Sequence, residues 1–592
     1  MRLAKTAAIL FVLLSVAAAA GRAQTASGEV NGTVTDKSGG LVAGATVKLT
    51  NQATKIEDWI ATNSAGYFVF INVKPGSYVL GAEAKGFKTT QISPFDVGVN
   101  QTVTQTIRLE VGAVNEHVVV NAEAVMLEGS SSELGTVISE RAVNDLPLNG
   151  RNFRSIGCCE GNVGIPGSGF SDASFHGQQN RSKLYFFDGI INTNIRGPTY
   201  IVIPNIDLIQ EFKVVGHDAK AEFGGATGGV VDMVSASGSS SFHGSAFEYV
   251  RNDAFDARNS VTDFDPATRT PKIFPFRQNQ FGATFSGHII KNKTFFSGGY
   301  DGWRYSKPSL NLSYVPTAAE VSGDFTQQPY FSGAPHALYN PYTGASGANR
   351  TRFMCDAFGN PLPPDMTPGP TFGTQPNGIP CNKIPQALIS TEIQQLFMNY
   401  AAQPNYSVAG DPGHNFIQTR STPNNSNSFQ VRIDHRLSRN DNLFFRYTEQ
   451  RVSVINPIGE VGFTEGGSTG RNYGGGWVHT FRHNLILDLR AGYAGRPSVD
   501  AGQQNQHPLG LAPLKQYGFK DIDKFSGILF RLNTNAWIAG ASNDFGLRGA
   551  APRENPNWSV TPNIIWLKGS HNMKMGVWLI NSKRIQKNIS KI

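Results

Sequence analysis

The chain has 592 residues, of which only 16% are charged, against roughly 25% in an average soluble protein. Glycine occurs 64 times and phenylalanine 38 times, and 40% of all residues are apolar, which excludes collagen-like and disordered classes. The 52 basic and 44 acidic side chains are dispersed without a long Lys/Arg block, so we expect no nucleic-acid partner.

The N-terminus has the parts of a secretory signal peptide. Residues 1–5 are short and basic, residues 7–20 are almost entirely apolar, and small residues follow. We predict a signal peptide over 1–23, cleaved between Ala23 and Gln24. The alternative is a membrane-anchoring helix, but the stretch is shorter than the roughly 20 residues needed to cross a bilayer. Composition leaves the mature chain as either a soluble secreted protein or an outer-membrane β-barrel.

Residues 24–112 predict a small β domain, because short β-rich segments alternate with turns rich in Gly, Pro, Asn and Ser. The motifs at 32–36, 62–68 and 75–79 resemble the carboxypeptidase regulatory-like domain. The resemblance implies a prealbumin-like sandwich, grouped with carbohydrate-binding-like folds. Aromatic side chains there are candidates for stacking on a glycan, although a place in the core is the favoured interpretation. They are Tyr67, Phe68, Tyr78 and Phe87.

Residues 113–241 have a different pattern of Gly-punctuated apolar segments. The series 185–189 (YFFDG), 209–214 (IQEFKV) and 221–231 (AEFGGATGGVV) resembles the plug domain of TonB-dependent outer-membrane receptors, in the Oar-like subgroup. That resemblance implies an α+β plug. It also makes a nearby strand a candidate for pairing with TonB by β-addition, with an ordinary interdomain strand as the alternative. The candidate residues are Val118, Val119 and Val120.

Residues 242–592 predict an antiparallel transmembrane β-barrel. From Ser428 to Leu437, apolar and polar residues alternate almost completely, and a short polar turn at 438–441 leads into a second strand. A soluble sandwich would alternate in the same way. Aromatic residues near strand ends, and short turns alternating with long connections, favour the barrel. The stretch of about 306–427 would be a long extracellular loop of this barrel.

Cys355 and Cys381 bracket part of that loop. We predict a disulfide rather than a zinc site, because neither cysteine has a companion at metal-ligand spacing. The pairing state of Cys158 and Cys159 stays open.

The barrel region holds far fewer candidate strands than the about 22 of plugged outer-membrane transporters. An open sheet in lipid would leave costly unpaired backbone groups. We therefore expect an incomplete barrel and a chain that is a C-terminally truncated part of a longer product.

The fold class expected is thus mainly β: signal peptide, sandwich, plug and partial barrel. The resemblance implies a TonB-dependent receptor in the outer membrane of a Gram-negative bacterium, surrounded by outer-membrane lipid and energised by TonB with ExbB and ExbD. A carbohydrate, a peptide or a metal chelate would be the ligand. We expect no cofactor and no enzyme activity, because catalytic motifs are weak or missing. The alternatives are a non-transporting adhesion or signalling protein and a soluble secreted β protein.

Overall fold

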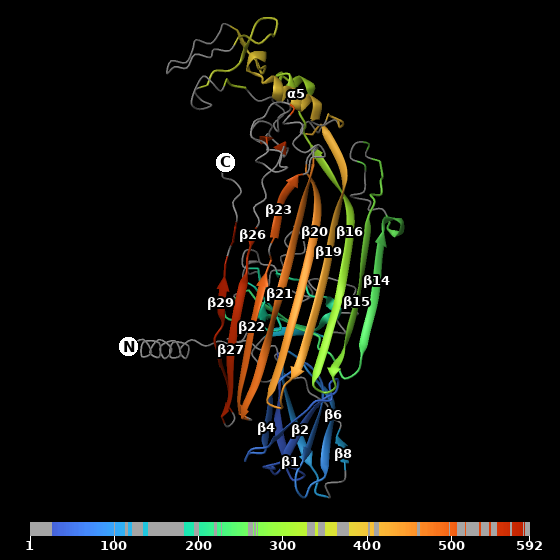
Figure 1. Ribbon diagram of the computed structural model, residues 1–592, viewed down its shortest axis with the longest axis vertical. Coiled ribbons are helices and arrows are strands. Elements are labelled where there is room, and N and C mark those ends of the chain that lie inside the picture. The colour runs from blue at the N-terminus through green and yellow to red at the C-terminus, as the bar shows by residue number, and fades with distance from the viewer. Residues whose placement is uncertain are drawn as a thin grey trace, which may run out of the picture.

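The computed structural model arranges the chain in three parts along its long axis (Figure 1). A sandwich of N-terminal strands lies at the lower end, a long curved sheet fills the middle, and a region with short helices lies at the upper end. The predicted cleavage site at Ala23 and Gln24, and Cys158 with Cys159, lie outside the described residues. The structure describes residues 27–99, 101–112, 117–120, 134–139, 183–194, 200–217, 222–226, 228–257, 265, 268, 270–327, 338–340, 350–363, 378–400, 403–407, 414–458, 462–482, 484–496, 498–505, 516, 532–533, 544–545, 553–568, 571–583 and 585–586.

The sandwich consists of a three-stranded and a five-stranded sheet whose buried faces share one hydrophobic core. The first sheet, in order, contains β4 (Tyr67–Val73), β1 (Gly28–Asp36) and β7 (Thr102–Leu109). The second contains β3 (Glu57–Ala61), β2 (Thr46–Asn51), β5 (Gly76–Glu83), β6 (Thr89–Val97) and β8 (His117–Val120). At Gly32 the strands β1 and β7 approach so closely that a Cβ would lie 1.7 Å from the carbonyl oxygen of Gln105, so only glycine fits.

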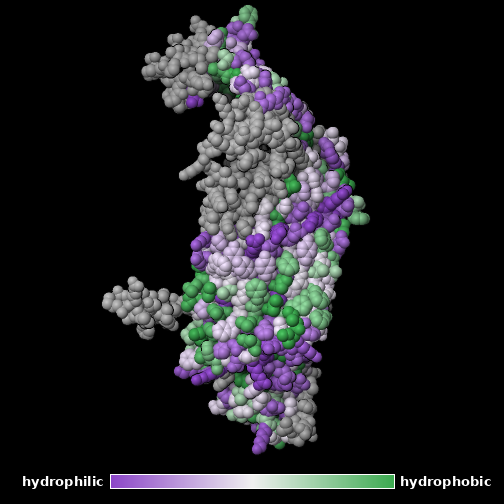
Figure 2. Space-filling model, in the orientation of Figure 1, coloured by the Kyte–Doolittle hydropathy of each residue, from purple (hydrophilic) through white to green (hydrophobic). Residues whose placement is uncertain are grey.

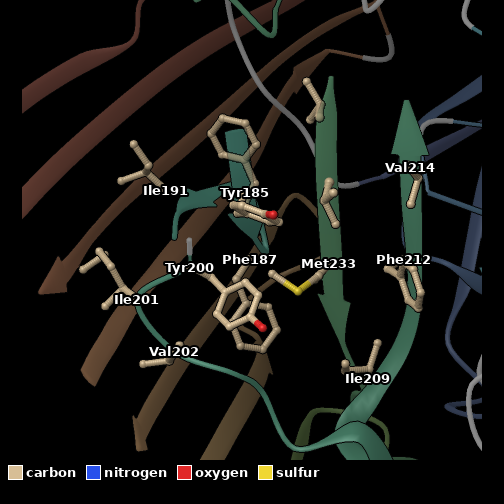
Figure 3. Close-up of a cluster of buried hydrophobic side chains, with 14 of the residues drawn as sticks. Tyr185, Phe187, Ile191, Tyr200, Ile201, Val202, Ile209, Phe212, Val214 and Met233 are labelled. Carbon is tan, nitrogen blue, oxygen red and sulfur yellow. The ribbon is translucent and has the colours of Figure 1, made fainter. Parts of the chain in front are cut away.

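A five-stranded sheet, here called the inner sheet, has the order β11-β10-β13-β12-β9. Its elements are β9 (Leu134–Ser139), β10 (Leu184–Phe187), β11 (Ile190–Ile191), the 3-10 helix η3 (Ile206–Leu208), β12 (Ile209–His217) and β13 (Val230–Ser235). β13 is buried along its whole length because both faces of the sheet are covered. Figure 3 shows the hydrophobic core, in which Tyr185, Phe212 and Met233 pack together; Ala494 of the surrounding sheet joins the same cluster.

The curved sheet, here called the outer wall, is antiparallel. Its main path contains β14 (His243–Asn252), β15 (Arg277–Ile290), β16 (Thr294–Ser313), β19 (Phe416–Arg436), β20 (Asp441–Ile458), β21 (Gly462–Arg482), β22 (Leu485–Gly495), β27 (Asn557–Lys568) and β28 (His571–Gly576). Shorter elements attached to it are η4 (Asp253–Phe255), β23 (Ser498–Asn505), β26 (Arg553–Glu554), β29 (Leu579–Ser582) and β30 (Ile585–Gln586). Among the described strands, β14 and β28 do not pair with each other, so the wall is an open part of a barrel.

The outer wall is apolar outside and polar inside, the reverse of a soluble domain. On β19, Phe429 is 48% exposed whereas the neighbouring Gln430 is 0% exposed. The alternation predicted from Ser428 to Leu437 is confirmed, and the predicted short turn joins β19 to β20. Figure 2 shows an apolar belt across the outside of the wall, bordered by hydrophilic residues toward the sandwich and toward the upper end. This pattern fits strands that face lipid outside and polar groups inside.

The upper region departs from the predicted loop of 306–427, because β16 and β19 continue to pair to Ser313 and Phe416. Backbone pairing needs no apolar side chains, so the strands extend past the end of their alternating pattern. The connection contains α4 (Ala318–Val321), β17 (Met354–Cys355), β18 (Ile379–Pro380), η6 (Gln386–Leu388) and α5 (Thr391–Tyr400). A separate two-stranded sheet contains β24 (Leu532–Asn533) and β25 (Asp544–Phe545). No helix within the described ranges is long and apolar enough to cross a membrane.

Candidate functional site

The turn between β10 and β11 carries Asp188 to the outer wall. Phe187 pairs with Ile190, so Asp188 and Gly189 form a two-residue hairpin loop. Their φ angles are 53° and 72°, as a type I′ turn requires. Asp-Gly is a preferred sequence for this turn, because Asp tolerates the left-handed region and Gly has no Cβ to oppose it. The local sequence therefore sets the position of the Asp188 carboxylate.

The Asp188 carboxylate is buried and accepts four hydrogen bonds. Ser235 of β13 donates its backbone N–H to Oδ1 (2.9 Å) and its hydroxyl to Oδ2 (2.7 Å). From the outer wall, Nη1 of Arg432 on β19 donates to Oδ1 (2.9 Å) and Nε of Arg446 on β20 donates to Oδ2 (2.7 Å). Each oxygen has two donors, and the charge is compensated where water is excluded.

Arg446 is completely buried, which is costly for a guanidinium unless every donor has a partner. Its Nη2 donates to Oδ1 of Asn472 (2.7 Å), and its Nη1 donates to Oγ1 of Thr448 (2.9 Å). The guanidinium carbon lies 3.6 Å from the centroid of the Phe187 ring. Ion pairing, hydrogen bonds and the aromatic contact together offset the loss of hydration.

Two further arginines extend this cluster. Arg432 forms a bidentate pair with Asp434, through Nε to Oδ2 (2.8 Å) and Nη2 to Oδ1 (2.9 Å). Arg490 of β22 donates to the backbone carbonyl of Asp188 (2.9 Å) and pairs with Asp488 (Nη2 to Oδ2, 3.1 Å). We call these residues the Asp188 network: Asp188, Arg432, Asp434, Arg446, Asp488 and Arg490. Its three carboxylates balance its three guanidiniums at the boundary between inner sheet and wall.

Neutral side chains of the wall bind the backbone of the inner sheet around this network. The contacts are Asn472 Nδ2 to Ile191 O (3.1 Å), Asn557 Nδ2 to Thr193 O (3.2 Å), Gln430 Nε2 to Leu208 O (3.3 Å), Ser297 Oγ to Ala236 O (2.6 Å) and Ile203 N to Gln450 Oε1 (3.2 Å). Backbone groups at the edges of a buried sheet need such partners, because leaving them unpaired is costly. The inner sheet is therefore held by polar contacts over a wide area.

Asp232 lies on β13 close to this network. Burial raises the pKa of Asp232 to about 8; the nearby charge of Arg490 opposes the rise, and those of Asp188 and Glu222 add to it. At neutral pH the Asp232 carboxyl is therefore largely protonated, and it adds no negative charge to the Asp188 network.

Val118, Val119 and Val120, the candidate TonB-contact residues, lie in β8. β8 pairs in parallel with β6 at the edge of the five-stranded sheet of the sandwich. No other described strand pairs with the second edge of β8. A free strand edge is what β-addition by another chain uses, and the assignment of TonB to it stays a prediction.

The four candidate glycan-stacking aromatics divide into two groups. Phe68 and Tyr78 are 1% and 6% exposed and lie in the sandwich core, so the prediction of glycan stacking is wrong for them. Strand alternation turns both rings inward, and the favoured core interpretation is confirmed there. Tyr67 is half-buried, and Phe87 is half-buried against the same core.

Cys355 and Cys381 form a disulfide in the upper region, with Cα atoms 5.8 Å apart. Within the described ranges, no three or more His, Cys, Asp or Glu side chains are grouped to hold a metal ion.

The sequence placed Asp188 in a receptor-like motif but did not identify its partners. Arg432, Arg446 and Arg490 occupy inward positions of predicted strands, and a charged residue at such a position is the signal that could have found them. Their pairing with Asp188 joins residues more than 240 positions apart, which periodicity cannot predict.

Two family models match the sequence. The Outer membrane beta barrel domain matches residues 234–590, and the Carboxypeptidase regulatory-like domain matches residues 29–110. A curated relative, the TonB-dependent transporter Oar of Myxococcus xanthus, is 24% identical over 288 residues, which are 46% of this chain and 26% of the relative.

Solved outer-membrane proteins share structural similarity at low sequence identity. The outer membrane transporter YddB of Escherichia coli is 10% identical with a TM-score of 0.44, over 76% of this chain and 48% of that one. A mutant of the ferric enterobactin receptor PfeA of Pseudomonas aeruginosa is 9% identical with a TM-score of 0.39, over 77% and 49%. The chain spans about a quarter of the curated relative and about half of these two proteins.

A curved antiparallel wall with an apolar outside, a polar inside and a sheet held within it defines a β-barrel protein of the Gram-negative outer membrane. The chain belongs to the Outer membrane beta barrel domain family. It also carries a regulatory-like domain and is similar to the TonB-dependent transporter Oar.

Proposed function

We propose that this protein is an Oar-like TonB-dependent receptor that imports a substrate across the outer membrane, with the inner sheet as the plug that closes the barrel. The substrate binds from the extracellular side, and TonB, together with ExbB and ExbD, supplies the energy from the inner membrane. An outer membrane holds no ATP and sustains little ion gradient, so a closed barrel needs a mechanical pull from the periplasm. A glycan, a peptide and a metal chelate are the candidate substrate classes.

The Asp188 network is the observation that carries this proposal. A plug has to hold firmly and yet be removable. Its contacts with the wall are largely polar, so water can replace each of them when the sheet moves, whereas an apolar interface would expose its surface to water. Two buried ion pairs, Asp188–Arg432 and Asp188–Arg446, join the inner sheet to the wall and must separate together, which supports the need for an applied force.

The free edge of β8 supports TonB as the source of this force. β8 precedes the inner sheet in the chain and lies in the sandwich at the lower end of the wall (Figure 1), the end that this proposal assigns to the periplasm. A TonB strand that added to β8 would bind through backbone hydrogen bonds, which depend little on side-chain identity.

Growth and uptake assays test the proposal. Strains with the gene deleted, or with Val119→Pro or Val119→Thr, are compared with the parent on a panel of oligosaccharides, peptides and iron chelates, with and without functional TonB. Proline removes a backbone N–H from β8, and threonine keeps it. We expect uptake of at least one compound to need the gene and TonB, to fall at least tenfold in Val119→Pro and to persist in Val119→Thr.

Unchanged uptake of every compound in the deletion strain, with a fall in cell attachment, would instead support the alternative of a non-transporting adhesion or signalling protein.

A further inference from the structure

The regulatory-like sandwich is docked on the plug and on the segment that leads from the plug to the wall. Ser240 of that segment donates its backbone N–H to the carbonyl of Ala53 (3.0 Å) and its hydroxyl to the carbonyl of Thr54 (2.7 Å), both in the turn after β2. Gln210 of β12 donates Nε2 to the carbonyl of Pro75 (2.6 Å), in the turn after β4. Two turns of the sandwich therefore bind the underside of the plug.

The same end of the sandwich also binds the periplasmic rim of the wall. Asp58 of β3 pairs with Arg436 at the end of β19 (Oδ1 to Nη2, 2.5 Å). The guanidinium carbon of Arg439, in the turn between β19 and β20, lies 5.7 Å from the ring centroid of Trp59. The sandwich is thus attached to the wall as well as to the plug.

Lys74 connects the sandwich to the Asp188 network itself. Its Nζ lies 2.6 Å from Oδ1 of Asp434, the carboxylate that also binds Arg432 and the hydroxyl of Ser237. Tyr78 donates its hydroxyl to the carbonyl of Lys74 (2.8 Å), which fixes the turn that carries the lysine. One side chain of the sandwich therefore contacts the charge cluster between plug and wall.

We propose that the sandwich is a periplasmic lock on the plug, with Lys74 as a positioning residue for Asp434, and that force on β8 releases the sandwich before it reaches the plug. This regulation rests on the proposed function. The sandwich binds both plug and wall, so it holds the two together from below. The plug cannot move toward the periplasm until these contacts break.

The positions of β8 and of the inner sheet along the chain predict which contacts break first. β8 is hydrogen-bonded to β6 of the sandwich, whereas the inner sheet begins at β9, later in the chain. A pull on β8 therefore loads the sandwich first. Its ion pairs with the wall each have one partly exposed side chain, so each contributes little and they can separate one after another. The buried Asp188 network is loaded only after Lys74 has left Asp434.

A reversible cross-link tests the lock. Ala53→Cys and Ser240→Cys place two cysteines at positions joined by a backbone hydrogen bond, a separation that a disulfide can span. Ala494→Cys on the wall, which packs against the plug core, is the reporter. A charged maleimide added to intact cells of the native host reaches this cysteine only when the plug moves.

In cells with TonB and no cross-link, we expect Ala494→Cys to react at least tenfold faster than in cells without TonB. Formation of the 53–240 disulfide should lower the rate to the level without TonB, and a reductant should restore it. The reporter variant without the cysteine pair, treated with the same reductant, controls for reduction of Cys355–Cys381. If the cross-linked protein reacts with the maleimide as fast as the protein without the cross-link, the proposed lock is wrong. A reporter that never responds to TonB overturns the proposed function instead.

Lys74→Met tests the positioning role without a cross-link. Loss of a partly exposed ion pair should speed TonB-dependent labelling roughly two- to fivefold. Lys48→Met removes an exposed ion pair with Glu57 in the same sandwich and should leave the rate unchanged. Equal rates in Lys74→Met and the parent would overturn the role of Lys74.

Discussion

At the scale of single residues, Asp188 illustrates how one buried carboxylate can join two parts of a protein. Its two oxygens receive two donors from Ser235 and one each from Arg432 and Arg446, so the inner sheet and the wall share it. A neutral replacement cannot serve all four donors, because an amide offers only one oxygen.

Asp188→Asn should therefore leave buried guanidiniums without compensation and weaken retention of the plug. Removal of one partner of a buried pair typically costs about 3–5 kcal/mol. We expect faster cleavage of the plug in pulse proteolysis of outer membranes and greater sensitivity of cells to a bulky antibiotic. Asp256→Asn, which removes an exposed partner of Arg251, is the matched control. Equal proteolysis of both variants and the parent would contradict this role.

Glu211 gives the boundary between sandwich and plug a dependence on pH. Burial raises the pKa of Glu211 to about 7, with a smaller contribution from Asp96; the hydrogen bond from the backbone N–H of Val99 and the charge of Lys213 act in the opposite direction. The protonated form is favoured in the folded protein. Its contribution to stability is complete below the ordinary glutamate pKa of 4.5 and is lost as pH rises through about 7.

As the pH is raised from 5 to 8, the urea midpoint of the parent should accordingly fall. Its free energy of unfolding should decrease by up to ~3 kcal/mol over this range. Glu211→Gln keeps an amide oxygen for Val99 and removes the titration, so its midpoint should change less over the same range. Glu83→Gln, at an exposed position of the sandwich, should follow the parent. A parent and a Glu211→Gln variant with the same pH profile would exclude Glu211 as the cause.

At the scale of strands and loops, the sequence predicted periodic features well. The alternation of β19 and the turn at 438–441 follow directly from the period of two in an extended chain. The sandwich was predicted by its turns and its motifs. Periodicity specifies the face on which Arg446 lies but not its partner, since Asp188 is 258 residues away. The Asp188 network therefore needed the structure, as did the extension of β16 and β19 beyond their alternating segments.

The disulfide of the upper region offers a test at this scale. Cys355 of β17 and Cys381 lie 26 residues apart, and closing such a loop stabilises by roughly 3 kcal/mol in the chain-entropy model. Cys355→Ser should make this region of intact cells more sensitive to trypsin, while the plug keeps its protease resistance. The double variant Cys355→Ser/Cys381→Ser separates loss of the bond from effects of a free thiol. Unchanged trypsin sensitivity in both would show that the short helices and strands suffice.

At the scale of the whole molecule, the low content of charged residues and the many aromatic residues fit a wall that places apolar side chains on its outer face and polar side chains on its inner face. Lipid-facing positions carry apolar rings such as Phe429 and Trp558, whereas many of the buried charged side chains belong to the Asp188 network. The ion pairs of Asp188 with the wall thus differ in burial from those that attach the sandwich to the wall. The first are buried, and each of the second has one side chain in partial contact with water.

Salt should distinguish these two kinds of contact. One side chain of each docking pair is substantially exposed, 47% for Lys74 and 55% for Asp58, and its partner is 3% exposed in Asp434 and 14% in Arg436. In the plug–wall pair, Asp188 and Arg446 are 3% and 0% exposed. At 1 M salt the screening length is about 3 Å, so exposed pairs weaken while pairs without water access are screened much less. We expect high salt to release the sandwich and to leave the plug in place.

Hydrogen exchange at constant pH can follow both events through two backbone amides. The amide of Ser240 donates to Ala53 and reports docking of the sandwich, and the amide of Ser235 donates to Asp188 and reports retention of the plug. Between 0.05 and 1 M salt, exchange at Ser240 should accelerate at least threefold while exchange at Ser235 stays constant. Equal acceleration at both positions would mean that sandwich and plug separate from the wall as one unit, and the proposed order of release would be wrong.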